Sequence, residues 1–165
     1  MPLPQLPSPS ELSSLPSGTR VVSGTRRLPS DFLSAVCPAV IAGQRLFWLD
    51  AGNCFDAYGF SYRCRALGSE PKRILARIKL ARPFNLYQLE TIVCRTLPRE
   101  WRGEPVVVSD PMGLFFDEDV PAKEARAVLG RVAAGMKLLP APWLVLSVER
   151  AAPPERASWT ALLGR

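Results

Sequence analysis

A run of three β-branched residues, Val106–Val108, ends in Ser109 and Asp110. A continuous apolar run without polar alternation is typical of a strand buried on both faces, as strands are in parallel α/β sheets. Ligands of such sheets gather at the carboxyl ends of the strands, so the sequence puts Asp110 at a position suited to chemistry. The alternative is that Asp110 only caps the turn that follows, with Pro111 helping to end the strand.

Similar apolar runs recur along the chain and alternate with segments of helical periodicity. Strands are expected at residues 19–23, 45–50, 78–81, 106–108 and 143–148. Helices are expected at residues 30–41, 55–67, 70–77, 86–97 and 121–139. Ser30 and Asn85 are expected to cap the helices that follow them, and Gly68 is expected to end the helix that precedes it. Pro38 is expected to kink or split the first helix. Strands that alternate with helices form parallel sheets with right-handed crossovers, so the predicted fold class is α/β.

The chain of 165 residues has room for one domain with a substantial core. Residues 1–18 are rich in Pro and Ser and are predicted to form a flexible arm. Residues 19–150 then form the α/β domain. Residues 151–165 are a proline-broken tail, or an edge strand or hairpin near Trp159–Leu163.

Composition limits the partners and the compartment. The net charge of +6 permits contact with nucleic acid or with an acidic protein, although arginine-rich usage is also typical of proteins from GC-rich genomes. No apolar run approaches the roughly 18 residues of a membrane-spanning helix, and the N-terminus does not have the pattern of a signal peptide. We therefore expect a cytoplasmic protein without a membrane partner.

The chain contains no histidine and four cysteines, namely Cys37, Cys54, Cys64 and Cys94. The lack of histidine excludes His-based zinc sites, Ser-His-Asp triads and imidazole acid–base chemistry. The cysteines have no CxxC spacing, so we expect free, buried thiols in a reducing compartment.

The order of several short motifs is more specific than any one of them. Residues 45–50 read RLFWLD, residues 78–85 read IKLARPFN, residues 106–110 read VVVSD, and an apolar strand follows at 143–148. This succession, over residues 19–149, resembles the ATPase core of the RecA/RadA recombinase family. The resemblance implies a RecA-like, P-loop-type fold of reduced size, with a mostly parallel sheet flanked by helices, and a role in DNA repair or recombination.

The same comparison implies a degenerate nucleotide site. A P-loop needs glycine-rich amides, a lysine and a Ser or Thr, but residues 23–31 read SGTRRLPSD, and Gly52 stands where the family has its catalytic glutamate. The resemblance thus predicts an enzymatically silent protein without cofactor. An active, divergent ATPase that binds ATP and Mg²⁺ is the alternative, with an arginine in place of the lysine. The residues of this degenerate site are Gly24, Arg26, Arg27, Asp50 and Asp110.

A basic segment is the candidate for nucleic-acid binding, because Phe60 and Tyr62 are interleaved with it and can stack on bases. An ordinary solvated helix face is the alternative. The residues are Arg63, Arg65, Lys72, Arg73, Arg77 and Arg82.

Phe115 and Phe116 are adjacent, so one of them is expected to face outward, and together with Asp117 they form the predicted partner interface. The acidic run 117–119 is predicted to complement the N-terminus of the next helix rather than to hold a metal. The sequence therefore predicts a non-catalytic RecA-like accessory protein that binds a protein partner and, as a further option, DNA, with homo- or hetero-oligomers left open. The alternatives are the divergent ATPase and a structural subunit without DNA contact.

Overall fold

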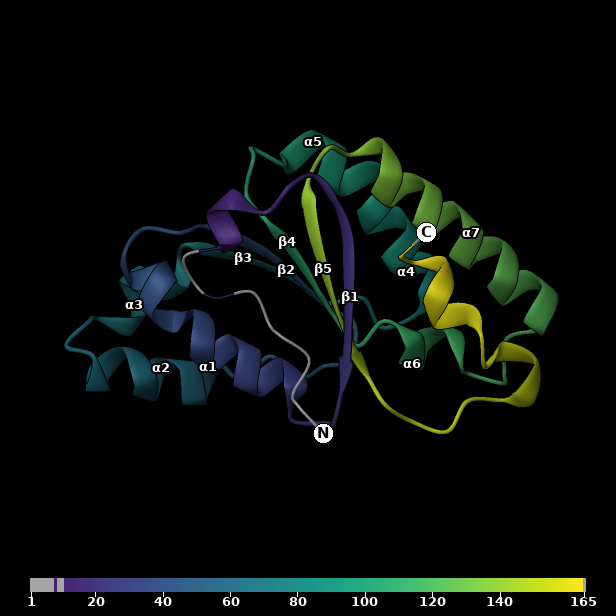
Figure 1. Cartoon of the computed structure of the whole chain (residues 1–165), viewed down its shortest axis with the longest axis horizontal. Coiled ribbons are helices and arrows are strands. Elements are labelled where there is room, and N and C mark those ends of the chain that lie inside the picture. Colours follow the sequence, from purple (N-terminus) through teal and green to yellow (C-terminus); the bar gives the residue numbers. More distant parts are fainter. Residues whose placement is uncertain (1–7, 9–10, 165) are drawn as a thin grey trace.

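Five parallel strands form a sheet at the centre of the protein in the computed structural model (Figure 1). The structure describes residue 8 and residues 11–164, so half of the predicted N-terminal arm, residues 1–7 and 9–10, lies outside the described residues. The sheet has the order β1-β5-β4-β2-β3, and every neighbouring pair is parallel. The strands are β1 (Gly18–Gly24), β2 (Leu46–Asp50), β3 (Ile78–Ala81), β4 (Val106–Ser109) and β5 (Pro142–Val148).

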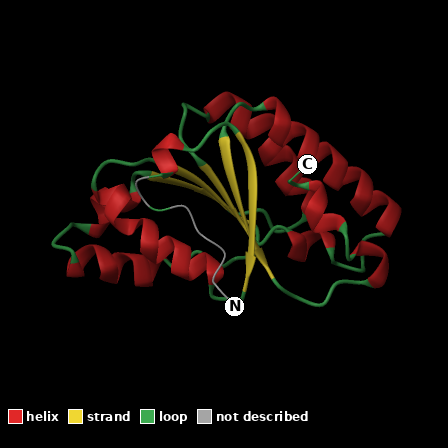
Figure 2. Cartoon of the chain, viewed as in Figure 1, coloured by secondary structure: helices red, strands yellow, loops and turns green. Residues whose placement is uncertain are grey.

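Helices cover both faces of this sheet, which gives three layers (Figure 2). On one face lie α1 (Leu28–Ile41), α2 (Ala57–Ala66) and α3 (Pro71–Leu75). On the other face lie α4 (Leu86–Thr91), α5 (Leu97–Glu100), α6 (Met112–Phe115) and α7 (Ala122–Leu138). The predicted α/β class, with a parallel sheet flanked by helices, is confirmed. None of the helices in the described part of the chain is long and apolar enough to cross a membrane.

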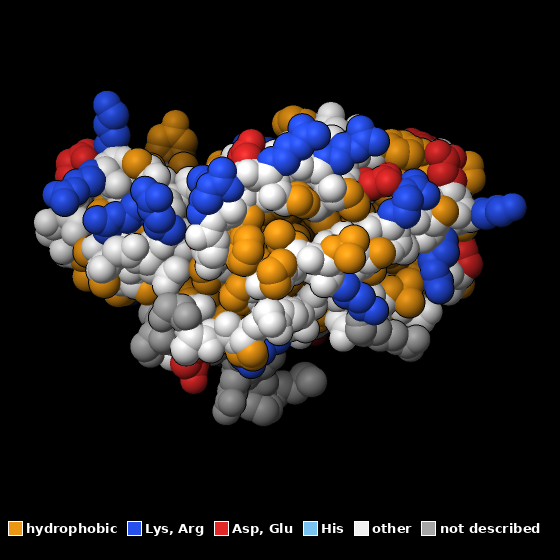
Figure 3. Space-filling model, turned by 90° about the horizontal axis from the view of Figure 1, so that it is seen from above, with side chains coloured by type: hydrophobic (Ala, Val, Ile, Leu, Met, Phe, Trp, Pro, Cys, Tyr) orange, Lys and Arg blue, Asp and Glu red, His pale blue; other side chains and the backbone are white. Residues whose placement is uncertain are grey.

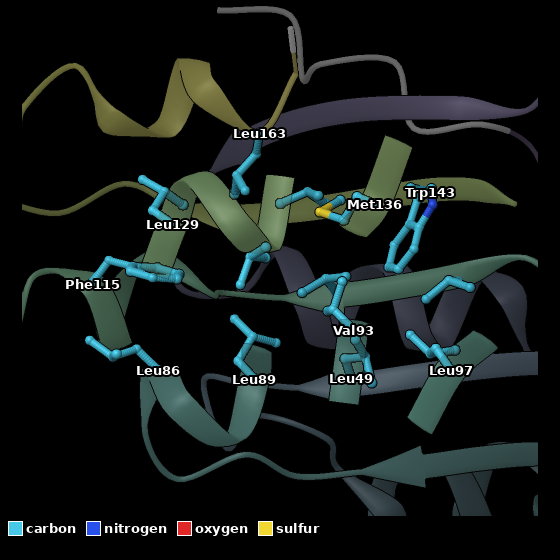
Figure 4. Packing of buried hydrophobic residues seen from close by; sticks show 14 of the residues in the cluster. Leu49, Leu86, Leu89, Val93, Leu97, Phe115, Leu129, Met136, Trp143 and Leu163 are labelled. Carbon is cyan, nitrogen blue, oxygen red and sulfur yellow. The ribbon is translucent and has the colours of Figure 1, made fainter. Parts of the chain in front are cut away.

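Alternate residues of each strand supply the two cores. In β2, Phe47 and Leu49 pack towards α4–α7, whereas Leu46 and Trp48 pack towards α1–α3. All five residues of β2 are buried, as expected for a central strand covered on both faces. Figure 4 shows the first core, in which side chains from α4, α6 and α7 meet those of the strands.

Local signals in the sequence account for some of the helix ends. The Asn85 side chain accepts from the amide of Gln88 at 2.9 Å and caps α4, and Gly68 follows α2 with a φ of 72°. The predicted cap at Ser30 is wrong, because α1 begins at Leu28 with a proline in its first turn. The predicted split at Pro38 is also wrong; α1 runs through this exposed residue, close to its end.

The C-terminal segment packs on the domain as short 3₁₀ turns, at Pro154–Arg156 and Trp159–Leu162. The edge strand or hairpin expected near Trp159–Leu163 is therefore wrong. Trp159 and Leu163 are buried in the α4–α7 core, and Arg156 is 2% exposed. Burial of these apolar side chains explains why the segment folds over the helices instead of extending the sheet.

Candidate functional site

The carboxyl ends of β2 and β4 meet at a point where the chain changes direction. The connection from β2 leads outward to β3, whereas the connection from β4 leads the other way to β5. Such a switch point leaves a crevice outside the strand ends, where open α/β sheets bind ligands. Asp50 is the last residue of β2 and pairs in register with Ser109 of β4, and Asp110 follows directly. The two predicted carboxylates therefore lie at one edge of the sheet.

The carboxylate of Asp50 is fully buried and saturated with donors. Oδ1 accepts from the amide of Cys54 at 2.8 Å and from the Ser109 hydroxyl at 3.0 Å. Oδ2 accepts from the amide of Phe55 at 3.1 Å and from Arg82, whose Nε lies at 2.9 Å and Nη2 at 2.8 Å. A carboxylate whose oxygens already meet this many donors has little capacity left for a ligand, so Asp50 acts as an anchor for the loop after β2.

Asp110 lies beside this anchor in a different environment. Its φ of 49° is in the left-handed region, and it forms an ion pair with Arg150, just beyond β5. Its Oδ1 is buried and has no hydrogen-bond partner among the described residues. Burial raises the pKa of Asp110 above its ordinary value, while the Arg150 guanidinium opposes the shift. Asp110 is thus the less satisfied of the two carboxylates.

Gly52 packs directly against Asp110. A Cβ at position 52 would lie 2.6 Å from the Cβ of Asp110, so the close approach of the two loops requires a glycine. A glutamate side chain, which the family resemblance would place at position 52, therefore does not fit this arrangement.

A cavity of about 320 Å³ opens at the same edge of the sheet. Burial raises the pKa of the Cys54 thiol to about 11, so this group is protonated at neutral pH and is a poor nucleophile. Because the Cys54 thiol is neutral, the charged groups in the cavity lining are two arginines and one carboxylate, and the carboxylate already pairs with one of the arginines. The lining residues are Arg26, Gly52, Cys54, Asp110, Val148 and Arg150.

The connection from β1 to α1 contains only residues 25–27. A phosphate-binding loop between a strand and a helix spans the eight residues of its glycine-rich motif, so this connection is too short to cradle phosphates in that way. Gly24 ends β1, Arg26 reaches the cavity, and Arg27 is an exposed residue at the start of α1. The structure thus brings Arg26 near Asp110, but it does not bring Arg27 into the cavity lining.

The basic segment divides into two groups. Arg77 donates to the carbonyls of Val40 and Ile41, each at 2.7 Å, and so caps the C-terminus of α1; Arg82 pairs with Asp50. The guanidinium groups of these two arginines therefore have partners within the protein, and their contact with nucleic acid stays a prediction. Lys and Arg side chains gather at the end of the molecule formed by α2 and α3 (Figure 3). The exposed cations of this group are Arg63, Arg65, Lys72 and Arg73.

Phe115 does not belong to an exposed interface. It is 0% exposed and packs in the α4–α7 core, while its neighbour Phe116 is partly buried against the same core. The carbonyls of Phe115 and Asp117 accept from Arg156 at 2.8 and 2.7 Å, so the C-terminal segment of the chain itself binds this loop. Among the three predicted interface residues only Asp117 is exposed.

No group of three or more Cys, Asp or Glu side chains among the described residues has a geometry that could hold a metal ion. Large exposed aromatic side chains lie elsewhere, with Tyr58 91%, Tyr62 75% and Phe84 74% exposed. Tyr58 and Tyr62 stand one helical turn apart on α2, near the exposed cations.

Sequence reasoning missed Arg150 and the role of Ser109. Arg150 follows the carboxyl end of β5, and the one available signal was the position of this cation directly after the expected strand at residues 143–148. Ser109 links two buried groups, since it accepts from the indole of Trp48 at 3.0 Å and donates to Asp50.

No protein-family model matches this chain, and no curated protein matches it either.

Proposed function

We propose that this chain is a RecA-like accessory protein of DNA repair or recombination that does not hydrolyse nucleotide and acts by binding other macromolecules. The proposal is based on the order of motifs in the sequence and on the ion pairs that the carboxylates at the ends of β2 and β4 form. A protein partner is the first expected ligand, and DNA is the second.

The observation that carries this proposal is that the two strand-end carboxylates already pair with arginines of the same chain. Asp50 is occupied by Arg82, and Asp110 by Arg150. Nucleotide hydrolysis in P-loop proteins needs a free carboxylate near Mg²⁺, a lysine and a loop of amides around the phosphates. The short β1–α1 connection and the close contact at Gly52 support the absence of that machinery.

The divergent ATPase remains a second candidate because of the cavity at the sheet edge. Its volume of about 320 Å³ falls within the range of small-molecule sites, and Arg26 and Arg150 would attract an anion. A nucleotide bound there would use arginines in place of an amide loop.

Calorimetric titration of the full chain with ATP and Mg²⁺, followed by a phosphate-release assay, separates the two candidates. We expect no saturable binding and no phosphate release. Saturable binding that is weakened by Arg26→Ala, accompanied by turnover, would replace the accessory function with the ATPase.

The binding role is tested by reversing the four exposed cations of α2 and α3 to Glu, at positions 63, 65, 72 and 73. We expect weaker retention of DNA in a gel-shift assay. A control with Arg95, Arg99, Lys123 and Lys137, all exposed, reversed to Glu changes the net charge equally. Equal losses in both variants would indicate unspecific attraction. An unchanged DNA signal together with stable co-purification of a partner would favour the structural-subunit alternative.

A further inference from the structure

Two buried thiols face each other between the first two helices. The Sγ atoms of Cys37 in α1 and Cys64 in α2 are 3.7 Å apart, and both residues are 0% exposed. Cys37 and Cys64 are free cysteines. Their sulfur atoms are in van der Waals contact across a packed helix pair.

This arrangement is close to that of a disulfide. A disulfide needs an S–S distance of about 2.05 Å and Cβ atoms that point towards each other. The two sulfur atoms, 3.7 Å apart, must approach each other by about 1.65 Å to reach the bond length, so the bond requires only a local shift of the two side chains and their helices. The two cysteines are 27 residues apart in the sequence with β2 between them, so the bond would close a loop that contains β2 and would join two helices packed on the same face of the sheet.

We propose that Cys37 and Cys64 form a site of oxidative modification that closes to an intramolecular disulfide with a small two-electron oxidant such as hydrogen peroxide. One thiolate attacks a peroxide oxygen, which breaks the O–O bond and leaves a sulfenic acid and one water after protonation. The second thiolate then attacks the sulfenic sulfur, forms the S–S bond and expels a second water. The two thiols are oxidised and the peroxide is reduced, so two thiols and one peroxide yield one disulfide and two waters.

Burial makes this reaction slow in the closed structure. Burial raises the pKa of Cys37 to about 12, so its reactive thiolate is scarce at neutral pH. The reaction therefore proceeds through a transient opening of α2. This helix has ten residues but only Phe60 and Cys64 are buried, and few buried contacts are typical of an element that opens locally.

The position of the pair suggests what its oxidation would control. Cys64 lies between Arg63 and Arg65, and α2 also carries Tyr58 and Tyr62, so a disulfide would fix the exposed basic and aromatic face of α2 to α1. This inference does not depend on the proposed function, since the chemistry needs only the two thiols.

The experiment treats the full chain with hydrogen peroxide, blocks the remaining thiols with a maleimide under denaturing conditions, and maps the peptides by mass spectrometry. We expect a linked pair of peptides that contain residues 37 and 64, with a mass about 2 Da below the sum of the two free peptides. Dithiothreitol should separate them again. The melting temperature of the oxidised protein should rise by about 5–10 °C, as expected for a closed loop of this length.

The matched controls are a Cys54→Ser, Cys94→Ser variant, which should still form the bond, and Cys37→Ala and Cys64→Ala variants, which should not. Peptide mapping of the unsubstituted protein gives the answer even if one variant does not fold. Linkage through Cys54 or Cys94, disulfide-linked dimers, or sulfinic acid at Cys64 without a linked peptide would each overturn the proposal.

Discussion

Replacing Asp50 by Asn should destabilise the protein strongly although the side chain keeps its shape. The carboxylate is 0% exposed and accepts from donors on both oxygens, so an amide group must turn its own N–H₂ towards some of them. With the amide nitrogen at the Oδ2 position, Phe55 loses its acceptor and the Arg82 guanidinium loses its counter-charge. The reverse orientation instead faces Cys54 and Ser109 with a donor.

The expected loss follows from these contacts. Charge-assisted hydrogen bonds contribute about 1.5–3 kcal/mol each, but the Arg82 side chain is 36% exposed, so water replaces part of its interaction with Asp50. We assign about 1–2 kcal/mol to the pair with Arg82 and about 1 kcal/mol to the unsatisfied amide. The free energy of unfolding should therefore fall by about 2–3 kcal/mol, and the melting temperature by about 5–10 °C.

Urea unfolding followed by circular dichroism measures this loss, and Asp110→Asn is the matched control. The control should cost less, about 1–2 kcal/mol, because it weakens only the ion pair with Arg150, while Oδ1 of Asp110 has no described partner and Asn tolerates a φ of 49°. Equal losses in the two variants would refute the assignment of Asp50 as the anchor. A stable Asp50→Asn protein would refute it as well.

Three further predictions concern packing and pH. Gly52→Ala should lower the free energy of unfolding by about 1–3 kcal/mol, because the added Cβ clashes with Asp110. Gly130→Ala, which has open space around it in α7, should raise the free energy of unfolding by about 0.5–1 kcal/mol, and urea unfolding compares the two variants. Trp159→Ala should cost about 3–5 kcal/mol in the same assay, and a loss below 1 kcal/mol would mean that the C-terminal segment does not support the core. The pKa of Cys54 is raised to about 11 from 9.0, so its stabilising contribution is complete below pH 9 and disappears as the pH rises through 11. Cys54→Ala should therefore flatten the decline of melting temperature over that interval, and identical pH profiles would contradict the shift.

Short-range patterns in the sequence predicted the elements of the fold well. Runs such as Val106–Val108 are buried strands, and their alternation with helices predicted the parallel sheet. The order of the strands was not predicted, because packing between distant segments places β1 and β3 at the two edges. The error at Trp159–Leu163 has a similar origin, since an apolar segment can bury its side chains against helices as well as in a sheet.

The candidate site was predicted only in part, for an electrostatic reason. The sequence indicated that Asp50 and Asp110 would lie at the carboxyl ends of strands, and the structure has both at one edge. Their partners Arg82 and Arg150 lie 32 and 40 residues away along the chain, and no local pattern in the sequence pairs them with these carboxylates. A list of cations does not distinguish a guanidinium that pairs inside the fold from one that faces solvent, so the pairing of Arg82 with Asp50 was not predicted.

The pairing of β1 with β5 also determines when the fold can be completed. Gly18 pairs with Pro142 and Gly24 with Val148, and β5 is the only strand that β1 contacts among the described residues. On the ribosome, β1 must wait until β5 emerges, which at about 5–20 residues per second is an interval of several seconds. During that time the backbone of β1 has no partner strand to pair with. Pairing between segments so far apart in the sequence is typical of proteins that fold slowly. The nascent chain is therefore most exposed to misfolding just before its last strand appears.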